Sequence, residues 1–462
     1  MIPMTVGEIA AVVDGTPVDA DVVVDAPAAI DSRRVAPGGL FVALPGENTD
    51  GHDFVPSALT AGASASLVAR PVEGPHVQVA DVAVALARLA RHVHDRLTHP
   101  LDGDGLRTVG ITGSAGKTST KDLLAHVLEA AGPVVAPEGS FNNELGVPLT
   151  VLRADSSTTA LVVEMGARGM GHIATLCAIA PPTVGVVLNV GTAHVGEFGS
   201  VEAIAIAKGE LVEALPPAGT AVLNADDHRV AAMADRTSAS VLTFGQAGQL
   251  RFAGLELTSD GWPEVSLEHA GTSVTFVLPQ PGLHHGSNAA AVAAAALALG
   301  LDLDTVAERL ATASARSPHR MARAVTSEGI VVVDDAYNAN PESMAAALQW
   351  LARTAEPGRA TAVLGAMLEL GEESLARHRE LGRLAQSLGL ARVVAIGTEA
   401  APIAEAAGAA GVAVPDVDVA IATLRASLRS GDVVLVKASR GCRLERVADA
   451  LLDDTRHTAD GS

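Results

Sequence analysis

A glycine-rich segment that ends in lysine and threonine is the strongest chemical signal in the sequence. It reads Val109-Gly110-Ile111-Thr112-Gly113-Ser114-Ala115-Gly116-Lys117-Thr118-Ser119, between an apolar run and a helical pattern. Such glycines let successive backbone N–H groups face a phosphate, and the following helix N-terminus adds positive potential. Lys117 would reach the terminal phosphates, and the Thr118 hydroxyl would ligate magnesium. The most general form of the motif has glycine where Ile111 stands, so a glycine-rich turn that only opens a helix is the alternative. The strand–loop–helix context favours a nucleotide site at residues 113–119.

Lysine is rare in this chain. The only lysines are Lys117, Lys121, Lys208 and Lys437, and arginine supplies the other basic charges. Because an ammonium and a guanidinium differ in shape and chemistry, a retained lysine suggests that an amine is needed. Lys121 is the exception, since one turn along the helix from Lys117 it is expected to be solvated.

A nucleotide site leaves two functional classes open, a ligase and a GTPase-like switch. A switch should read guanine through an Asn-Lys-x-Asp motif. That motif is absent, because the four lysines follow Gly116, Thr120, Ala207 and Val436. This argues against a guanine switch but not against an ATPase.

The composition excludes several classes of protein. The 462 residues carry a formal charge of -21 and only 2% aromatic residues, which argues against nucleic-acid or anionic-membrane binding. The two cysteines lie in segments that read as separate domains, so a reducing compartment is favoured over a disulfide framework. The N-terminus lacks a secretory signal, and the longest apolar stretch, 289–301, is too short to span a bilayer. We therefore expect a cytoplasmic protein without membrane insertion.

Length and hydrophobic periodicity predict three domains, 1–83, 84–316 and 317–462. The first mixes short Val-rich runs with Pro and Gly turns, typical of a small α/β or mostly β domain. A helical spacing follows over 82–97. In the second and third domains, apolar runs alternate with helical patterns, as in a parallel sheet with crossover helices and a doubly wound sheet. The expected strands are 108–111, 160–163, 184–190, 221–223, 330–333, 361–364, 393–396 and 433–436.

Further motifs extend over nearly the whole chain. They are Asp31-Ser32-Arg33, Asp50-Gly51-His52-Asp53-Phe54, Phe141-Asn142-Asn143-Glu144, Glu164-Met165-Gly166, Asn189-Val190-Gly191-Thr192-Ala193-His194, Ala207-Lys208-Gly209-Glu210, Asp334-Asp335-Ala336-Tyr337-Asn338-Ala339-Asn340-Pro341 and Met367-Leu368-Glu369-Leu370-Gly371. With the segment 112–118, they make the sequence resemble the Mur ligase family.

The resemblance implies an α/β fold of three domains: a small N-terminal UDP-binding domain, a central P-loop ATPase-like domain with a parallel sheet, and a C-terminal Rossmann-like domain that completes the site. It also implies the chemistry. A peptide carboxylate attacks the γ-phosphate of ATP, and an amine then displaces phosphate from the resulting acyl phosphate.

The resemblance next implies a magnesium site. We expect it at Thr118, Glu164 and His194, because a metal must offset the charge of a carboxylate and several phosphate oxygens. Lys208 is the candidate for carbamylation, which would turn its ammonium into a carboxylate-like metal ligand.

For ATP, the resemblance implies contacts from three further residues. Asn288 is expected near adenine, Arg320 near the γ-phosphate and Asp335 at the ribose. The segment departs from the family's Gly-x-His-Asn pattern at His285, and a cap on a helix over 289–298 is the alternative for Asn288. The expected catalytic residues are Lys117, His194, Lys208 and Arg320.

The remaining candidates are expected to bind the other substrates. A hydroxyl and a guanidinium suit the uridine diphosphate oxygens, although Ser32 and Arg33 also fit a surface turn. Asn338 and Asn340 would donate hydrogen bonds to the acceptor carboxylate or shape the turn before Pro341. The full expected set is Ser32, Arg33, Asn142, Asn143, Tyr337, Asn338 and Asn340, with a packing role open for Tyr337.

The acceptor follows from the branch that the motifs resemble. The stretches 338–341 and 364–371 resemble the dipeptide-adding branch, and the Asp-Asn-Pro-Arg motif of a diaminopimelate-adding relative is absent. The resemblance therefore implies that the chain adds D-alanyl-D-alanine to UDP-N-acetylmuramoyl tripeptide, and we expect it to act as a monomer. An amino-acid-adding relative and a P-loop switch protein are the alternatives. The third residue of the peptide, diaminopimelate or lysine, is left open.

Overall fold

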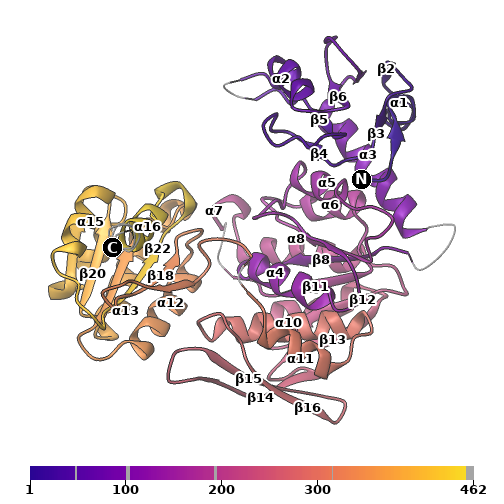
Figure 1. Ribbon diagram of the computed structural model, residues 1–462. Coiled ribbons are helices and arrows are strands. Elements are labelled where there is room, and N and C mark those ends of the chain that lie inside the picture. Colours follow the sequence, from indigo (N-terminus) through magenta and orange to yellow (C-terminus); the bar gives the residue numbers. More distant parts are fainter. Residues whose placement is uncertain (47–48, 100–104, 192–194, 315, 454–462) are drawn as a thin grey trace.

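Three groups of elements follow one another along the chain, each built around its own sheet. The computed structural model describes residues 1–46, 49–99, 105–191, 195–314 and 316–453. Figure 1 shows the N-terminal elements above a large central sheet, with the C-terminal sheet beside it. The predicted α/β class is confirmed, and no helix of the described residues is long and apolar enough to cross a membrane.

The N-terminal group combines short strands with helices. Its elements are β1 (Met4–Thr5), α1 (Val6–Val13), β2 (Thr16–Val18), β3 (Val23–Val24), β4 (Ala28–Ala29), β5 (Leu40–Val42), α2 (Val55–Thr60), β6 (Ala65–Val68), β7 (His76–Gln78) and α3 (Val82–Thr98). The main sheet has the order β2-β7-β6-β5-β4. Asp81 is the N-cap of α3, and its carboxylate accepts hydrogen bonds from the N–H groups of Ala83 and Val84.

The central group is built on one large sheet. Its strands are β8 (Arg107–Thr112), β9 (Val134–Val135), β10 (Ala160–Glu164), β11 (Val184–Val187), β12 (Thr220–Asn224), β13 (Ser240–Gly245), β14 (Leu250–Leu257), β15 (Pro263–His269) and β16 (Thr272–Val277). The order is β16-β15-β14-β13-β12-β11-β8-β10-β9. Strands β8 to β13 pair in parallel, so their carboxyl ends meet at one edge. The last three strands were not predicted: β14 pairs in parallel with β13, and β15 and β16 then extend the sheet by antiparallel pairing.

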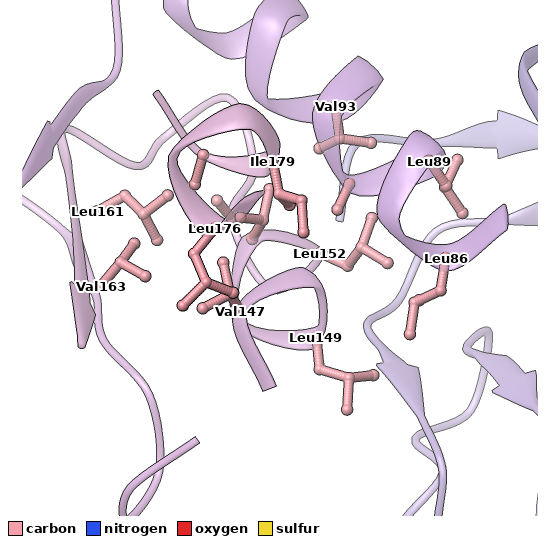
Figure 2. Close-up of a cluster of buried hydrophobic side chains, with 14 of the residues drawn as sticks. Leu86, Leu89, Val93, Val147, Leu149, Leu152, Leu161, Val163, Leu176 and Ile179 are labelled. Atoms are coloured by element: carbon pink, nitrogen blue, oxygen red, sulfur yellow. The ribbon is translucent and has the colours of Figure 1, made fainter. Parts of the chain in front are cut away.

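Helices cover both faces of the central sheet. They are α4 (Lys117–Leu128), α5 (Gly146–Val151), α6 (His172–Ile179), α7 (Val195–Phe198), α8 (Val201–Glu213), α9 (His228–Ala231), α10 (His284–Ala298) and α11 (Leu303–Ala311). α4 and α10 pack against each other over one apolar core. α5, α6 and α8 share a second core that continues into the N-terminal group. Figure 2 shows this continuity, with Leu86, Leu89 and Val93 of α3 beside Leu149 and Leu152 at α5.

The C-terminal group is a doubly wound sheet. Its elements are β17 (Ala322–Val325), β18 (Val331–Asp335), α12 (Pro341–Thr354), β19 (Ala360–Leu364), α13 (Ser374–Ser387), β20 (Arg392–Ile396), α14 (Ala401–Ala406), β21 (Gly411–Val414), α15 (Val417–Arg425), β22 (Val433–Lys437) and α16 (Glu445–Asp453). The order is β17-β18-β22-β19-β20-β21, and only β17 is antiparallel to its neighbour within the described residues. The apolar cores on its two faces are separate.

The predicted strands of the second and third domains all exist, most of them within one or two residues of the expected ends. The exception is 184–190, because β11 ends at Val187 and the chain then turns toward the P-loop, where Leu188 N donates to Thr112 O.

Candidate active site

The loop between β8 and α4 forms the centre of the candidate site. Gly116, which precedes α4, has a φ of +85°, and a Cβ there would come within 2.5 Å of Asn288 Oδ1. Glycine is therefore required at this position, by the backbone conformation and by the close approach of α10. The strand, loop and helix lie as a phosphate-binding loop requires.

Lys117 lies across this loop. Its Nζ donates a hydrogen bond to the carbonyl oxygen of Gly113 at 2.7 Å. Burial lowers the pKa of Lys117; Glu164 opposes this shift, and Arg320 adds to it. The ammonium is thus poorly hydrated, and its present acceptor is the neutral carbonyl oxygen of Gly113. A phosphate oxygen would be a stronger acceptor, because it is charged.

Oxygen ligands suited to a metal lie beside the loop. Thr118 Oγ1 donates to Glu164 Oε2 at 2.9 Å, and Asn142 Nδ2 donates to Glu164 Oε1 at 2.8 Å. Glu164 ends β10 and is only 1% exposed. A hydroxyl and a carboxylate fit Mg²⁺, which takes most of its other ligands from water and phosphate. Among the described residues, no group of three His, Cys, Asp or Glu side chains could hold a metal ion by itself. His194 lies outside the described residues.

Lys208 reaches the same region from α8. It is 6% exposed, and it makes no hydrogen bond or ion pair with any residue that the structure describes. Burial lowers the pKa of Lys208 well below the usual lysine value, and Lys117 lowers it further. A lysine in this environment favours the neutral, nucleophilic amine.

Arg320 connects the C-terminal group to the loop. Its Nη2 donates to Thr118 Oγ1 at 3.2 Å, its guanidinium lies 4.2 Å from the ring centroid of Tyr337, and its Nε is buried without a partner among the described residues. The residues on either side, His319 and Met321, have φ of +58° and +51°. This conformation is rare outside glycine and is typical of functional sites. The unpaired N–H of Arg320 suits an anionic ligand.

Asp335 and Lys437 form a buried ion pair at the ends of β18 and β22. Lys437 Nζ donates to Asp335 Oδ2 at 2.6 Å and to the carbonyl oxygen of Asn338 at 2.8 Å. Parallel pairing places the two charged residues opposite each other. The side chain of Asn338 is exposed. Asn340 is the N-cap of α12, where its side-chain oxygen accepts from Ser343 N, so only its amide N–H groups remain for a ligand.

The first turn of α10 faces the P-loop. His285 is 2% exposed, and neither of its ring nitrogens has a partner among the described residues. Burial lowers the pKa of His285 well below its usual value. Asn288 lies inside the helix, which begins at His284, so the alternative of Asn288 as a cap is wrong. Packing of this turn against the loop overrides its modest helix propensity.

Lys121 is not solvated, contrary to the expectation from its position one turn after Lys117. It is 2% exposed and donates to the carbonyl oxygens of Pro137 and Gly139 at 2.9 and 3.1 Å, and it pairs with Asp122 at 2.6 Å. The loop after β9 covers this face of α4, which a helical pattern cannot reveal. The rarity of lysine was the one signal in the sequence that pointed to it.

The expected uridine diphosphate residues lie in an exposed turn. Arg33 donates from Nε and Nη2 to the Asp31 carboxylate at 2.9 and 2.8 Å, and Ser32 is partly exposed. The neighbouring Arg34 pairs with Glu138 at 2.5 Å, which joins this turn to the loop that also contacts Lys121.

Two more predicted residues surround that loop. Asn143 Oδ1 accepts from Gly146 N at 2.9 Å and so shapes the start of α5. The hydroxyl of Tyr337 contacts Ser140 Oγ, and Arg440 donates to it at 3.3 Å. Tyr337 therefore packs between arginines and joins the C-terminal group to the central one.

Three family models match consecutive parts of the chain. They are the Mur ligase family catalytic domain at residues 28–94, the Mur ligase middle domain at 111–296, and the Mur ligase glutamate ligase domain at 319–440.

Relatives and solved structures agree with these matches. The chain is 45% identical to the UDP-N-acetylmuramoyl-tripeptide--D-alanyl-D-alanine ligase of Mycobacterium tuberculosis, over 98% of this chain and 99% of that protein. It is 35% identical to the enzyme of the same name from Escherichia coli, over the same shares. A crystal structure of MurF from Acinetobacter baumannii has a TM-score of 0.87 at 30% identity, covering 98% of this chain and 99% of that one. MurF from Thermotoga maritima in complex with ADP has a TM-score of 0.80 at 32% identity, covering 94% and 98%.

Proposed function

The chain belongs to the Mur ligase family, and we propose that it joins D-alanyl-D-alanine to UDP-N-acetylmuramoyl tripeptide while ATP is converted to ADP and phosphate. It is an ATP-dependent peptide ligase. One observation carries the proposal: Arg320, from the start of the C-terminal group, reaches Thr118 in the P-loop helix beside Lys117 and Glu164. The γ-phosphate of ATP, the terminal carboxylate of the tripeptide and the amino group of the dipeptide can therefore meet beside the P-loop.

The reaction takes two displacements. The terminal carboxylate of the tripeptide attacks the γ-phosphorus of ATP, the bond to the β-phosphate oxygen breaks, and ADP leaves. The uncharged amino group of the dipeptide then attacks the acyl carbon of the acyl phosphate. Phosphate leaves, and the nitrogen loses a proton as the amide forms. Activation is needed because a free carboxylate has no adequate leaving group.

Positive charge around the P-loop favours the first displacement. Negative charge gathers as a carboxylate approaches the phosphates, and Lys117, Arg320 and the N–H groups of residues 113–119 offset it. Because Arg320 comes from outside the central group, the set is complete only when the C-terminal group is in place. Water is then also kept from the acyl phosphate.

Magnesium would be held by Thr118 and Glu164, with His194 and a carbamylated Lys208 as further ligands. The Thr118 hydroxyl and the Glu164 carboxylate support this assignment, because both are hard oxygen ligands and Thr118 Oγ1 lies 2.9 Å from Glu164 Oε2. The metal supplies charge neutralisation for the phosphate oxygens when it is bound. Carbamylation would begin with attack of the neutral Lys208 amine on carbon dioxide, followed by loss of a proton from nitrogen.

The remaining site residues would bind the substrates away from the reacting atoms. Asn288 and Asp335 are assigned to the adenosine of ATP, and the unpaired His285 ring lies one turn before Asn288 on α10. Ser32 and Arg33 are assigned to the uridine diphosphate. The peptide and the dipeptide acceptor are assigned to Asn142, Asn143, Tyr337, Asn338 and Asn340.

The enzyme would act in the cytoplasm as a monomer, with domains at 1–83, 84–316 and 317–462. Free Cys177 and Cys442 agree with a reducing compartment. The first boundary is the least sharp, because α3 packs on both α1 and α5.

The test is ADP release with ATP, Mg²⁺ and UDP-N-acetylmuramoyl tripeptide, with the amine varied and a no-amine control, and the product identified by mass. The pentapeptide should form with D-alanyl-D-alanine. Faster product formation with diaminopimelate, lysine or single D-alanine would instead favour an amino-acid-adding Mur ligase. No ADP release with any amine would overturn the ligase assignment.

A further inference from the structure

The segment that leads to Arg320 lies along α4. We call residues 316–321 the linker, because they connect α11 to β17. Arg316 Nη2 donates to Glu129 at 2.6 Å, Ser317 N donates to Asp122 Oδ2 at 3.0 Å, and Arg320 donates to Thr118 at 3.2 Å. Positions 129, 122 and 118 follow one another toward the N-terminus of α4. The linker therefore runs antiparallel to the helix and brings Arg320 to the P-loop.

Lys121 and Asp122 hold the middle of this path. Asp122 accepts from the linker backbone at Ser317 and pairs with Lys121 at 2.6 Å. Lys121 Nζ also lies 3.4 Å from Ser317 Oγ and donates to the carbonyl oxygens of Pro137 and Gly139. Both side chains are almost fully buried, at 2% and 6% exposed. A buried ion pair contributes little stability by itself, but it defines the positions of the groups that it binds.

The same ammonium anchors a second segment. Residues 137–142 contain Glu138, which pairs with Arg34, and Ser140, which contacts Tyr337. They end at Asn142, whose amide donates to Glu164 at 2.8 Å. One buried lysine therefore binds two segments, one that carries Arg320 and one that carries the partner of Glu164.

We propose that Lys121 and Asp122 are positioning residues of the ligase reaction. They fix the linker so that Arg320 reaches the P-loop, and they fix residues 137–142 so that Asn142 orients Glu164. Lys121 lies one helical turn beyond Lys117, and its ammonium is fully used by the protein, so it acts through these residues. This inference rests on the proposed function.

The first test compares Lys121→Met with Arg316→Gln. Methionine keeps the length of the side chain but removes the ammonium, and Arg316 belongs to the same linker but pairs with Glu129 at the far end of α4. We expect kcat for ADP release to fall about 10- to 100-fold in Lys121→Met, the loss that a small misplacement causes. The Kd for ADP should stay within about threefold, because Lys117 and the loop are intact. Arg316→Gln should match the wild type, as an exposed pair contributes little.

A double-mutant cycle separates positioning from general damage. In an Arg320→Ala background, Lys121→Met should lower kcat less than in the wild type, because one of the two groups that it positions is already gone and only the effect through Asn142 and Glu164 remains. Equal losses in both backgrounds would overturn the proposal, and so would a kcat of Lys121→Met within twofold of the wild type. Asp122→Asn, which keeps an acceptor for Ser317 N but removes the charge, repeats the cycle if Lys121→Met does not fold.

A measurement without substrates distinguishes this inference from the proposed function. In the free enzyme, hydrogen exchange of peptides covering 137–142 and 317–321 should be faster in Lys121→Met, and exchange of 137–142 should be unchanged in Arg316→Gln. Unchanged exchange in Lys121→Met would overturn the anchoring role even in an active ligase. A wild type that releases no ADP would count against the proposed function, while the exchange result would still decide the anchor.

Discussion

None of the lysines in this chain is a freely solvated surface residue. Lys121, Lys208 and Lys437 are 2%, 6% and 3% exposed, and Lys117 folds back over the P-loop. Each lies where an ammonium or an amine has a defined partner or environment. The other basic charge of the chain is carried by arginine, which remains protonated and cannot react as an amine. The four lysines thus belong to the candidate site and its supports, and the basic charge of the surface comes from arginine.

The first prediction at this scale concerns Lys117. Lys117→Ala should give a folded protein without measurable turnover, because the loop can form while the transferred phosphoryl group loses its cation. Circular dichroism and thermal unfolding check the fold, and ADP release checks activity. Near-normal ligation would rule out the phosphate-loop assignment.

The second prediction concerns Lys208. Lys208→Ala should be nearly inactive and should recover in part with added formate or acetate, since a short carboxylate can replace the missing ligand. Removing and then restoring bicarbonate should lower and restore the activity of the wild type, because carbamylation needs carbon dioxide. If Lys208→Arg is fully active, the carbamate and the metal role both fail, since a guanidinium cannot be carbamylated in this way.

At the scale of elements, the site depends on how α3 and β8 are joined. His94 of α3 is 2% exposed, and its Nε2 lies 2.8 Å from Thr108 Oγ1 of β8. Burial lowers the pKa of His94 to about 4, from an ordinary value near 6.5. The imidazole is therefore neutral in the native protein at pH 5, whereas the same histidine in the unfolded chain is mostly protonated.

This difference predicts a loss of stability in acid. Between pH 6.5 and about 4 the unfolded state binds a proton that the native state does not, so the free energy of unfolding falls as the pH falls. The full effect would be about 3 kcal/mol for this shift. In His94→Gln, which keeps a polar partner for Thr108, the pH dependence of Tm over this range should be flatter. His285, whose pKa burial also lowers, remains as background in both proteins, and parallel pH profiles would contradict the prediction.

At the scale of the whole molecule, two of the contacts between the central and C-terminal groups are hydrogen-bonded and lie apart from each other. Arg320 and Tyr337 form one contact at the P-loop side. The other is the turn between β14 and β15, where Gly261 O accepts from Trp350 Nε1 at 2.9 Å. A Cβ at Gly261 would come within 2.1 Å of Thr354 Cγ2, so this turn fits closely against α12.

Ligand binding should draw the groups together. The three substrates are charged and meet between the groups, and water there would hydrolyse the acyl phosphate. We therefore expect the groups to close around the bound substrates. Small-angle scattering with a non-hydrolysable ATP analogue and the tripeptide nucleotide should show a smaller radius of gyration than the free enzyme. An unchanged radius with both ligands bound, as verified by calorimetry, would contradict closure.

The sequence by itself determined the local features of this protein. The P-loop needs only neighbouring residues, so strand, glycine turn and helix could be predicted from residues 107–128. The buried strands β10, β18, β19 and β22 appeared as short Val- and Ala-rich runs, because both of their faces are covered. The resemblance to the Mur ligase family could also be found from the sequence, because each motif that supports it is short and contiguous.

Only the tertiary structure decided which distant groups meet. The contact of Arg320 with Thr118 joins residues 202 positions apart, and Lys121 binds Ser317 across 196. A helical pattern gives the face on which Lys121 lies, but not that a loop and a linker cover this face. For the same reason a helix cap remained the alternative for Asn288, although α10 begins one turn earlier, at His284. The burial, the hydrogen-bond partners and the pKa of such residues depend on segments that come together only in the folded chain. They are set by contacts in space, which the order of residues along the chain does not give.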